Sequence, residues 1–321
     1  MRRMFLFITL SLLYSQTNSN RPVHTYSIVA FDEATGQLGV AVQSHWFSVG
    51  TLVPWAEAGV GAVATQSFVK VEYGPDGLDM MRSGKTANDA LSTLLAMDEN
   101  SAVRQVAMVD VNGNVATHTG KKCIDAAGHY RGKNYSVQAN LMDKSTVWTA
   151  MAEAYESSSG DLADRMLAAL DAAQAEGGDI RGKQSAAMLI VTGDPTGIPW
   201  KDRLLDIQIA DHPEPLKELR RLIQVHRAYE HANQGDLYLE LDDIEKALKE
   251  YEIAAKLYPE NAELPYWTAI TLAGIDQLDQ ALPIFKEVFN RDPDLKRLTP
   301  RLVKAGLLPD DKQVLDEIMR E

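Results

Sequence analysis

The residues most suited to chemistry are the hydroxyl side chains of the segment 25–30, Thr-Tyr-Ser-Ile-Val-Ala. Cleavage in front of Thr25 would create an α-amino group with a pKa of about 8, and its neutral form is a general base. A terminal threonine then carries nucleophile and base on one residue, so no histidine is needed. Ser27 is the fallback nucleophile, but alternate residues of a strand share one face, so Ser27 is expected rather to support Thr25. The alternative is that the run is an ordinary strand, since its residue types favour strands.

Three groups of polar side chains follow or precede predicted strands. They are Gln66 and Ser67, then Gln138 and Asn140, and finally Asp179, Arg181, Gln184 and Ser185. Amides at strand ends can donate to an oxyanion or to a substrate amide, and Arg181 can clamp a carboxylate. Polar residues also end strands simply because strands reach the surface there. Taken jointly with Thr25, the groups predict one site at one edge of stacked sheets.

Each candidate has an expected role in that site. Thr25, Ser27, Asn140 and Asp179 are the predicted catalytic residues. Asn140 is expected to hydrogen-bond the oxyanion or the substrate, and Asp179 is expected to orient the amine or the substrate. The residues expected to contact substrate are Gln66, Ser67, Arg181, Gln184, Ser185 and His129. His129 lies in the run Ala-Gly-His-Tyr, where a hydrogen-bonding role is a better fit than a metal ligand.

Composition and motifs exclude several classes of protein. The net charge of −13 argues against nucleic acid, which requires a basic surface. The sequence has no HExxH, no paired CxxC and no phosphate-binding loop, so neither a metal nor another cofactor is expected. Cys123 is the only cysteine, so no intramolecular disulfide can form, and a buried structural thiol is the default interpretation.

The first 19 residues are typical of a signal peptide. Arg2 and Arg3 precede an apolar run over 5–14, and cleavage is expected after Ser19. The run is too short to span a membrane as a helix. The sequence therefore predicts a secreted or periplasmic protein that is not held in a membrane after cleavage.

Strand and helix patterns predict a layered α+β domain over residues 25–226. Strands are expected at 25–32, 38–42, 60–65, 106–111, 115–119, 135–140, 185–191 and 204–209, and helical spacing occurs over 74–95, 146–155 and 162–175. The short connection 112–114, Asn-Gly-Asn, requires antiparallel neighbours. The prolines of 211–215 predict a boundary, followed by a linking helix over 213–226.

Residues 227–321 repeat with a period of 34. Ala247 recurs as Ala281, Tyr251 as Phe285, and Pro259 as Pro293. This spacing resembles the tetratricopeptide repeat, whose other positions match Gly235 and Tyr238, while Ala269 replaces a usual glycine. A generic pair of helical hairpins is the alternative. The helix 213–226 and a helix over 302–319 are expected to cap the two ends. The resemblance implies that this region holds a peptide or a protein partner.

With these residues in view, segment 25–226 resembles the bacterial family called domain of unknown function 1028, which is grouped with the N-terminal-nucleophile (Ntn) hydrolases. The matching runs are 26–30, 39–42, 59–67, 73–75 with 77–78, 137–140, 177–179 with 181–182, 184–187 and 211–213. The resemblance implies an αββα sandwich, with two antiparallel sheets between helical layers. It also implies that Thr25 is the terminal nucleophile and that an amide bond is cleaved.

Two features depart from that pattern. His24, rather than a small residue, precedes Thr25, so cleavage after Ser19 would leave residues 20–24 covering the amine. Thr25 would then become terminal only through self-cleavage or trimming. Ala139 replaces the family's usual glycine, which is expected to narrow the site.

Two functions follow as hypotheses. The first is a secreted Ntn-type amidohydrolase acting through Thr25 on a small-molecule or peptide amide. The second is a catalytically silent scaffold that binds a protein partner through residues 227–321. Retention of residues 20–24 in the mature chain would favour the second.

Overall fold

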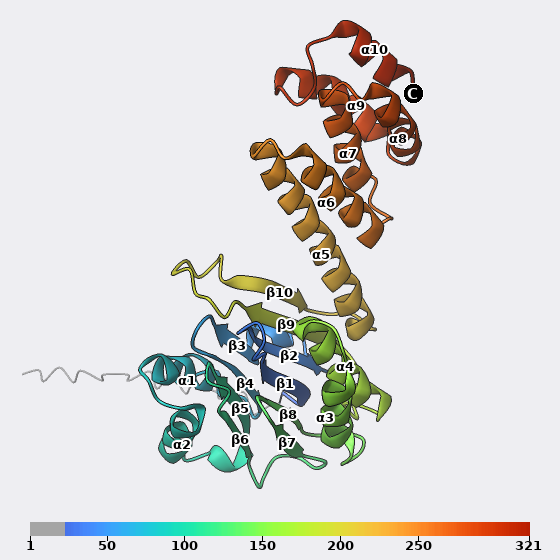
Figure 1. Cartoon of the computed structure of the whole chain (residues 1–321). Helices are drawn as coiled ribbons and strands as arrows, with labels where there is room; N and C mark the ends of the chain where they lie inside the picture. Colours follow the sequence, from blue (N-terminus) through green and yellow to red (C-terminus); the bar gives the residue numbers. More distant parts are fainter. Residues whose placement is uncertain (1–22) are drawn as a thin grey trace, which may run out of the picture.

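The computed structural model describes residues 23–321, which form an α+β region followed by a helical region (Figure 1). The strands are β1 (Thr25–Phe31), β2 (Leu38–Ser44), β3 (Pro54–Glu57), β4 (Gly61–Ser67), β5 (Arg104–Asp110), β6 (Val115–Thr119), β7 (Gly128–Gly132), β8 (Tyr135–Ala139), β9 (Ser185–Val191) and β10 (Arg203–Ile209). The helices of the first region are α1 (Tyr73–Arg82), α2 (Ala87–Met97), α3 (Val147–Ser157) and α4 (Leu162–Ala175). The expectation that residues 1–19 form a signal peptide concerns a segment outside the described residues.

The strands form two antiparallel sheets, as the sequence predicts. The six-stranded sheet has the order β10-β9-β2-β1-β8-β7, and the four-stranded sheet has the order β3-β4-β5-β6. The hairpin of β5 and β6 turns at Gly113, whose φ of 76° is readily adopted by glycine. β1 lies inside the larger sheet between β2 and β8, so the residues at its start are flanked on both sides.

Alternating side chains of the strands build three apolar layers. Tyr26 and Ile28 face α3 and α4, whereas Val29 of the same strand faces the smaller sheet. On the other side of the smaller sheet, Val63 and Met108 pack against α1 and α2. The two sheets therefore face each other, and a pair of helices covers each outer face (Figure 1).

Three details of the first region differ from the sequence prediction. β3 and β7 were not predicted, because β3 is only four residues long and the side chains of β7 are largely exposed and lack apolar alternation. The helical spacing over 74–95 corresponds to two separate helices, α1 and α2, and not to one continuous helix. The break contains Gly84 at a φ of 94°, and Thr86 caps α2 by accepting a hydrogen bond from the Asp89 backbone N–H.

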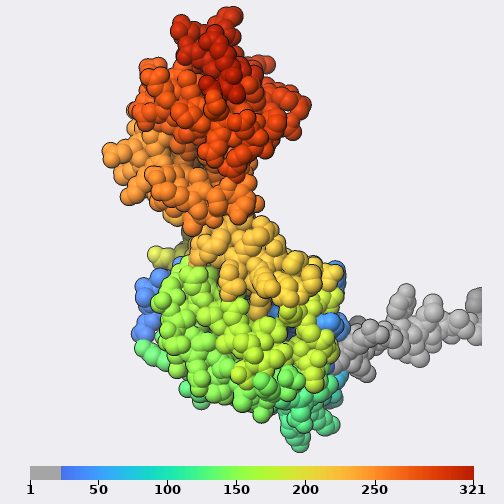
Figure 2. Space-filling view, turned by 90° about the vertical axis from the view of Figure 1, so that its right-hand side faces the viewer, coloured from blue at the N-terminus to red at the C-terminus, as the bar shows by residue number. Residues whose placement is uncertain are grey.

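A single long helix, α5 (Pro215–Glu240), connects the two regions. Its first half packs Leu216, Leu219 and Ile223 into the apolar layer beside α4. Its second half packs on α6 (Ile244–Leu257). The boundary expected between residues 226 and 227 therefore lies inside one helix, and Figure 2 shows a narrower waist at this junction.

Four more helices follow, namely α7 (Glu263–Gly274), α8 (Leu278–Arg291), α9 (Pro293–Lys304) and α10 (Lys312–Arg320). The residues separated by 34 positions occupy equivalent places: Ala247 and Ala281 are fully buried, as is Phe285. The helix expected over 302–319 is instead the end of α9 and all of α10, separated by Gly306 at a φ of 76°. Within residues 23–321, no helix is both long and apolar enough to cross a membrane.

Candidate functional site

Thr25 is the first residue of β1 and is completely buried. It pairs with Ser44 at the end of β2, and its Oγ1 lies 3.4 Å from the Ser44 Oγ. The Thr25 hydroxyl donates to the carbonyl oxygen of Val23 at 2.9 Å. In the described chain the residue is internal, because Val23 and His24 precede it.

The carbonyl group of the peptide bond between His24 and Thr25 is held by two side-chain donors. The Ser44 hydroxyl donates to the His24 carbonyl oxygen, and Arg181 Nη2 donates to the same oxygen at 3.2 Å. Two donors on one carbonyl oxygen stabilise the negative charge that forms there when a nucleophile attacks the carbon. The peptide bond directly before Thr25 is thus the polarised one.

Asp179 fixes the position of Arg181. The Asp179 side chain is fully buried and accepts hydrogen bonds from Arg181 Nε at 3.0 Å and from Nη2 at 2.7 Å. It also accepts from the backbone N–H groups of Arg181 at 3.0 Å and His45 at 3.1 Å. A bidentate ion pair with further backbone donors leaves the guanidinium little freedom to rotate.

Val23 and His24 fill the space at the start of β1. Val23 pairs with Ser67 through two backbone hydrogen bonds of 2.6 and 2.9 Å, and Ser67 adopts a φ of 69°. The His24 ring is buried, and its Nδ1 lies 2.9 Å from the Asn140 Oδ1. Burial lowers the pKa of His24 below its usual value, although the hydrogen bond to Asn140 opposes the shift.

A chain of buried amides and hydroxyls runs between the sheets behind Thr25. Ser27 Oγ donates to Gln66 Oε1 at 2.6 Å and accepts from Gln138 Nε2 at 2.6 Å. Gln66 Nε2 and Asn140 Nδ2 both donate to Gln105 Oε1, at 2.7 and 2.8 Å. Because buried polar groups require partners, each member of this chain fixes the next.

The chain of amides also reaches the backbone of Thr25. The Thr25 carbonyl oxygen accepts from the Asn140 backbone N–H at 3.1 Å and from Gln66 Nε2 at 3.3 Å. The structure therefore brings Ser27, Gln66 and Asn140 to Thr25. Asp179 and Arg181 come to the same place from the segment that pairs with residues 141–143, and Arg181 contacts the His24 carbonyl oxygen.

Three predicted site residues lie elsewhere. The half-buried Gln184 side chain donates to Asp211 Oδ1 at 3.2 Å, and only the Gln184 backbone N–H reaches Ser44, whose carbonyl oxygen accepts from it at 3.1 Å. Ser185 holds the loop after β2, because its hydroxyl donates to the Trp46 carbonyl oxygen and accepts from a backbone N–H. His129 lies on the edge strand β7, where its Nδ1 is 2.8 Å from Thr119 Oγ1, a group that Gln105 also contacts.

The predicted Ser67 contributes differently from expectation. Its backbone pairs with Val23, while its Oγ is buried and has no hydrogen-bond partner in the described chain. Two further residues, Ser44 and Gln105, belong to the site but were not predicted. Ser44 follows the strand predicted over 38–42, and Gln105 precedes the one predicted over 106–111. Only strand pairing reveals that Ser44 faces Thr25 and Gln105 faces Gln66.

The same part of the chain gives no sign of a metal centre. Among residues 23–321, no cluster of three or more His, Cys, Asp or Glu side chains could hold a metal ion. Cys123 is buried, and burial raises the pKa of its thiol, which favours the unreactive protonated form. The groups that the described chain places around Thr25 are hydroxyls, amides, the Arg181 guanidinium, the Asp179 carboxylate and the His24 ring.

Fold and site together define an α+β protein with two facing antiparallel sheets and a buried polar site at the start of a central strand. Residues 25–219 match the family described as a family of unknown function, DUF1028. The chain belongs to this family.

One solved structure of the family is similar to this chain. It is a crystal structure of a protein from Silicibacter pomeroyi, with 31% sequence identity and a TM-score of 0.56. The similarity covers 63% of this chain and 88% of that protein. No curated protein matches the chain.

Proposed function

We propose that the protein is an Ntn-type hydrolase that cleaves an amide bond with Thr25 as nucleophile, in the periplasm or outside the cell. The order of helices and sheets supports an αββα sandwich of the Ntn kind. The position of Thr25 at the start of a central strand, beside a held carbonyl group, supports its role. The leader-like residues 1–19 support export.

The single observation that carries the proposal is the environment of the peptide bond between His24 and Thr25. Thr25 Oγ1 attacks the His24 carbonyl carbon while Ser44 and Arg181 stabilise the oxyanion. The C–N bond breaks, the amine takes a proton, and His24 becomes an ester on the Thr25 oxygen. One water molecule hydrolyses the ester. The products are a His24 carboxylate and a free Thr25 amine.

The processed chain then has the parts needed for turnover. The Thr25 amine takes the proton of its own hydroxyl, and the oxygen attacks a substrate amide. Departure of the His24 carbonyl leaves Ser44 and Arg181 free to bind the substrate carbonyl oxygen. The leaving amine takes up the proton, and water hydrolyses the resulting ester on Thr25. Asp179 acts through Arg181, and Gln66 and Ser27 act by positioning Thr25.

The segment before Thr25 indicates which substrates fit. Val23 forms backbone pairs with Ser67, and the His24 ring contacts the amide of Asn140. A peptidyl amide could make the same two contacts on the acyl side of its scissile bond, so we propose this class. Recognition of this kind adds a strand to a sheet edge through main-chain hydrogen bonds.

The first experiment tests the nucleophile through its own processing. The whole chain is expressed in a bacterial host that exports it, and intact mass and N-terminal sequence are measured. We expect the chain to begin at Thr25, and Thr25→Ala to retain residues upstream of it. Thr25→Ser is the matched variant, because it keeps a hydroxyl and should restore cleavage. Cleavage of Thr25→Ala at the same bond would refute self-processing.

The second experiment tests turnover with acetyl-Val-His p-nitroanilide, a probe built on the residues before Thr25. Processed protein should release p-nitroaniline, and the processed fraction of Ser44→Ala, quantified by intact mass, should show a kcat about 10²-fold lower, the effect expected from loss of one oxyanion donor. Surface variant Thr51→Ala is the control and should leave the rate unchanged. Equal release by processed protein and by uncleaved Thr25→Ala would refute the nucleophile assignment.

A scaffold that only binds a partner is the second candidate. The pairing of Val23 with Ser67 favours it, because this pairing holds the segment before Thr25 in place, and in the intact chain the Thr25 nitrogen is an amide and not a free amine. The 34-residue spacing of Ala247 and Ala281 supports a tetratricopeptide-like region that would hold the partner. If the exported chain starts at Asn20 and is never cleaved before Thr25, this result would support the scaffold function over the hydrolase. Binding should then be lost when residues 227–321 are deleted.

A further inference from the structure

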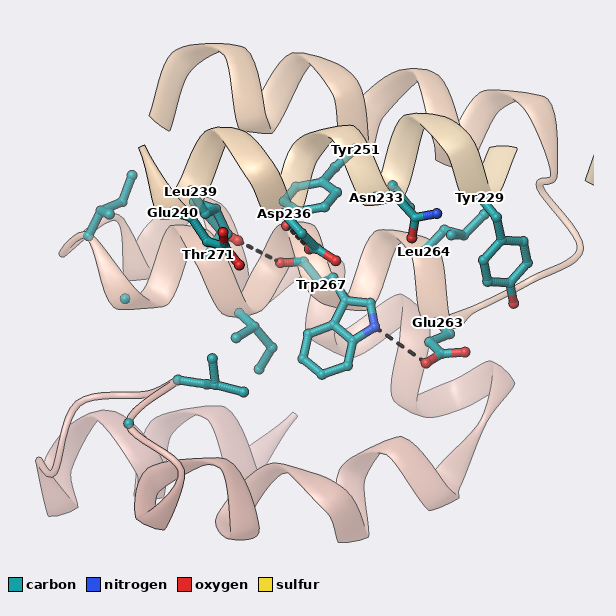
Figure 3. Close-up of a pocket in the computed structure, with 16 residues that line it drawn as sticks. Tyr229, Asn233, Asp236, Leu239, Glu240, Tyr251, Glu263, Leu264, Trp267 and Thr271 are labelled. Carbon is teal, nitrogen blue, oxygen red and sulfur yellow. Dashed lines mark hydrogen bonds between the residues drawn. The ribbon is translucent and has the colours of Figure 1, made fainter. Parts of the chain in front are cut away.

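A hollow lies in the helical region, and its role is independent of the hydrolase proposal. It is formed between α5, α7 and the segment after α9, and it has a volume of about 630 Å³ (Figure 3). Ligand sites usually enclose about 300–1,000 Å³, so the hollow is large enough for a few residues of a peptide.

One wall of the hollow is apolar. Leu264, Trp267 and Ile270 come from α7, and Leu239 faces them from α5. In Figure 3 the Trp267 ring projects into the hollow, and its Nε1 donates to Glu263 Oε1 at 3.3 Å. This hydrogen bond fixes the edge of the ring and leaves a face for an incoming group. A large apolar side chain of a ligand would be buried against this wall.

The rim of the hollow is acidic. Asp236 and Glu240 from α5 and Glu263 from α7 line it, and all three are exposed. No Lys or Arg is among the described residues that line it. The surrounding segment is also negatively charged, because residues 227–321 contain 12 Lys and Arg and 20 Asp and Glu, a net charge of −8. A cationic ligand is therefore attracted, and an acidic one is repelled.

We infer that this hollow binds a peptide segment that carries a lysine or arginine next to a large apolar side chain. The carboxylates of α5 and α7 bind the cation, and the face of Trp267 adds a cation–π contact. The apolar wall takes the neighbouring side chain. Asn233, which also lines the hollow, presents an amide that can both donate to and accept from a peptide main chain. A simple amine would leave the apolar wall uncovered.

The test is isothermal titration calorimetry of the full chain at low ionic strength. The probe is the acetylated and amidated peptide Leu-Lys-Leu-Arg, compared with Leu-Glu-Leu-Glu capped in the same way. We expect measurable affinity for the basic peptide only, weakened by added salt. Glu240→Gln and Trp267→Leu should each weaken binding about five- to tenfold, the effect of losing one charge-assisted or cation–π contact.

A matched control separates local recognition from overall charge. Glu287→Gln removes one carboxylate from α8, outside the hollow, and should leave the affinity unchanged. Circular dichroism should show unchanged helicity in all three variants. The inference is overturned if the basic peptide does not bind, if the acidic peptide binds equally well, or if Glu287→Gln weakens binding as much as Glu240→Gln. It is also overturned if n-butylamine binds as tightly as the peptide.

Discussion

The two regions of the molecule place their polar groups in opposite ways. In the α+β region, a chain of amides and hydroxyls is buried between two sheets, where Gln66, Gln105 and Asn140 are fully shielded from solvent. In the helical region the fully buried side chains are apolar apart from two that bond to each other, Tyr266 and Thr299, and the carboxylates of the hollow stay at its exposed rim. Buried and mutually bonded groups are suited to fixed geometry, whereas exposed ones suit adaptable binding.

The two sites also differ in how the chain assembles them. The site around Thr25 draws residues from β2, β4, β5, β8 and the loop before β9. The hollow is lined mainly by α5 and α7, which lie close together along the chain, with Tyr251 of α6 and a short segment after α9. Damage to the first site should therefore spread through both sheets, whereas damage to the hollow should stay local. Four predictions test this contrast, beginning with the largest expected effect.

The largest effect is expected from Phe285→Ala in the helical region. Phe285 is fully buried and packs edge-on against Tyr266 with ring centroids 6.0 Å apart. Removing a buried aromatic side chain costs about 3–5 kcal/mol of unfolding free energy, because a cavity remains. Hydrogen exchange followed by mass spectrometry should show faster exchange in α7 and α8 with β1 unchanged. Faster exchange throughout β1 would show that the regions unfold as one unit.

Gln105→Leu should have the next largest effect. The variant removes the shared acceptor of the Gln66 and Asn140 amides, which keep only longer contacts to backbone carbonyl oxygens, at a total cost of about 1–3 kcal/mol. Chemical denaturation should show a lower unfolding free energy for the α+β region. Intact mass should show slower processing at Thr25. The matched variant is Gln184→Leu, whose side chain lies outside the network and should cost about 0.5 kcal/mol or less. Equal losses for both variants would mean that the buried network contributes no specific stability.

The docking of residues 23–24 should depend on pH. Burial lowers the pKa of His24, so the docked state holds the neutral ring. Because the pKa of His24 is lower in the docked state than its unfolded value of about 6.5, its contribution to stability is fully present above pH 6.5 or so. This contribution is lost as the pH falls through the pKa of the docked state. Hydrogen exchange of Thr25→Ala, which keeps the segment attached, should show weaker protection of this segment in acid. His24→Gln should abolish that dependence, and its persistence would assign it to another group.

The smallest effect on stability is expected from Glu263→Gln at the rim of the hollow. An exposed carboxylate of this kind contributes about 0.5 kcal/mol or less to folding. The variant should therefore keep its melting temperature while losing affinity for the basic peptide. A large drop in melting temperature would place Glu263 in the folding core and remove the contrast between the two sites.

Much of the fold could be predicted from local patterns. Strand-favouring residue types, apolar runs and the alternation over 38–42 predicted the segments that became β1, β2, β5 and β9, and the Asn-Gly-Asn turn predicted antiparallel pairing, both of which are confirmed. β7 was missed because its exposed side chains carry no periodic signal. Family membership was also predicted from short runs of residues and is confirmed over 25–219.

The site was predicted in part. Thr25, Gln66 and Arg181 were grouped because nucleophiles, amides and guanidinium groups are recognisable by residue type. Gln184 and Ser185 were grouped with them only because they are close in sequence, and alternation along the chain directs them to other partners. Ser44 and Gln105 carry no signal of their own, since their importance depends on which strand lies opposite.

The sequence by itself determined most of the strands and helices, the acidic character, and the hydroxyl-rich start of β1, because these depend on local periodicity and residue type. Only the tertiary structure decided that Ser44 and Arg181 converge on the His24 carbonyl oxygen, residues that are 20 and 157 positions away from it. Sheet register and loop closure bring such distant groups together, and neither is encoded in any short segment.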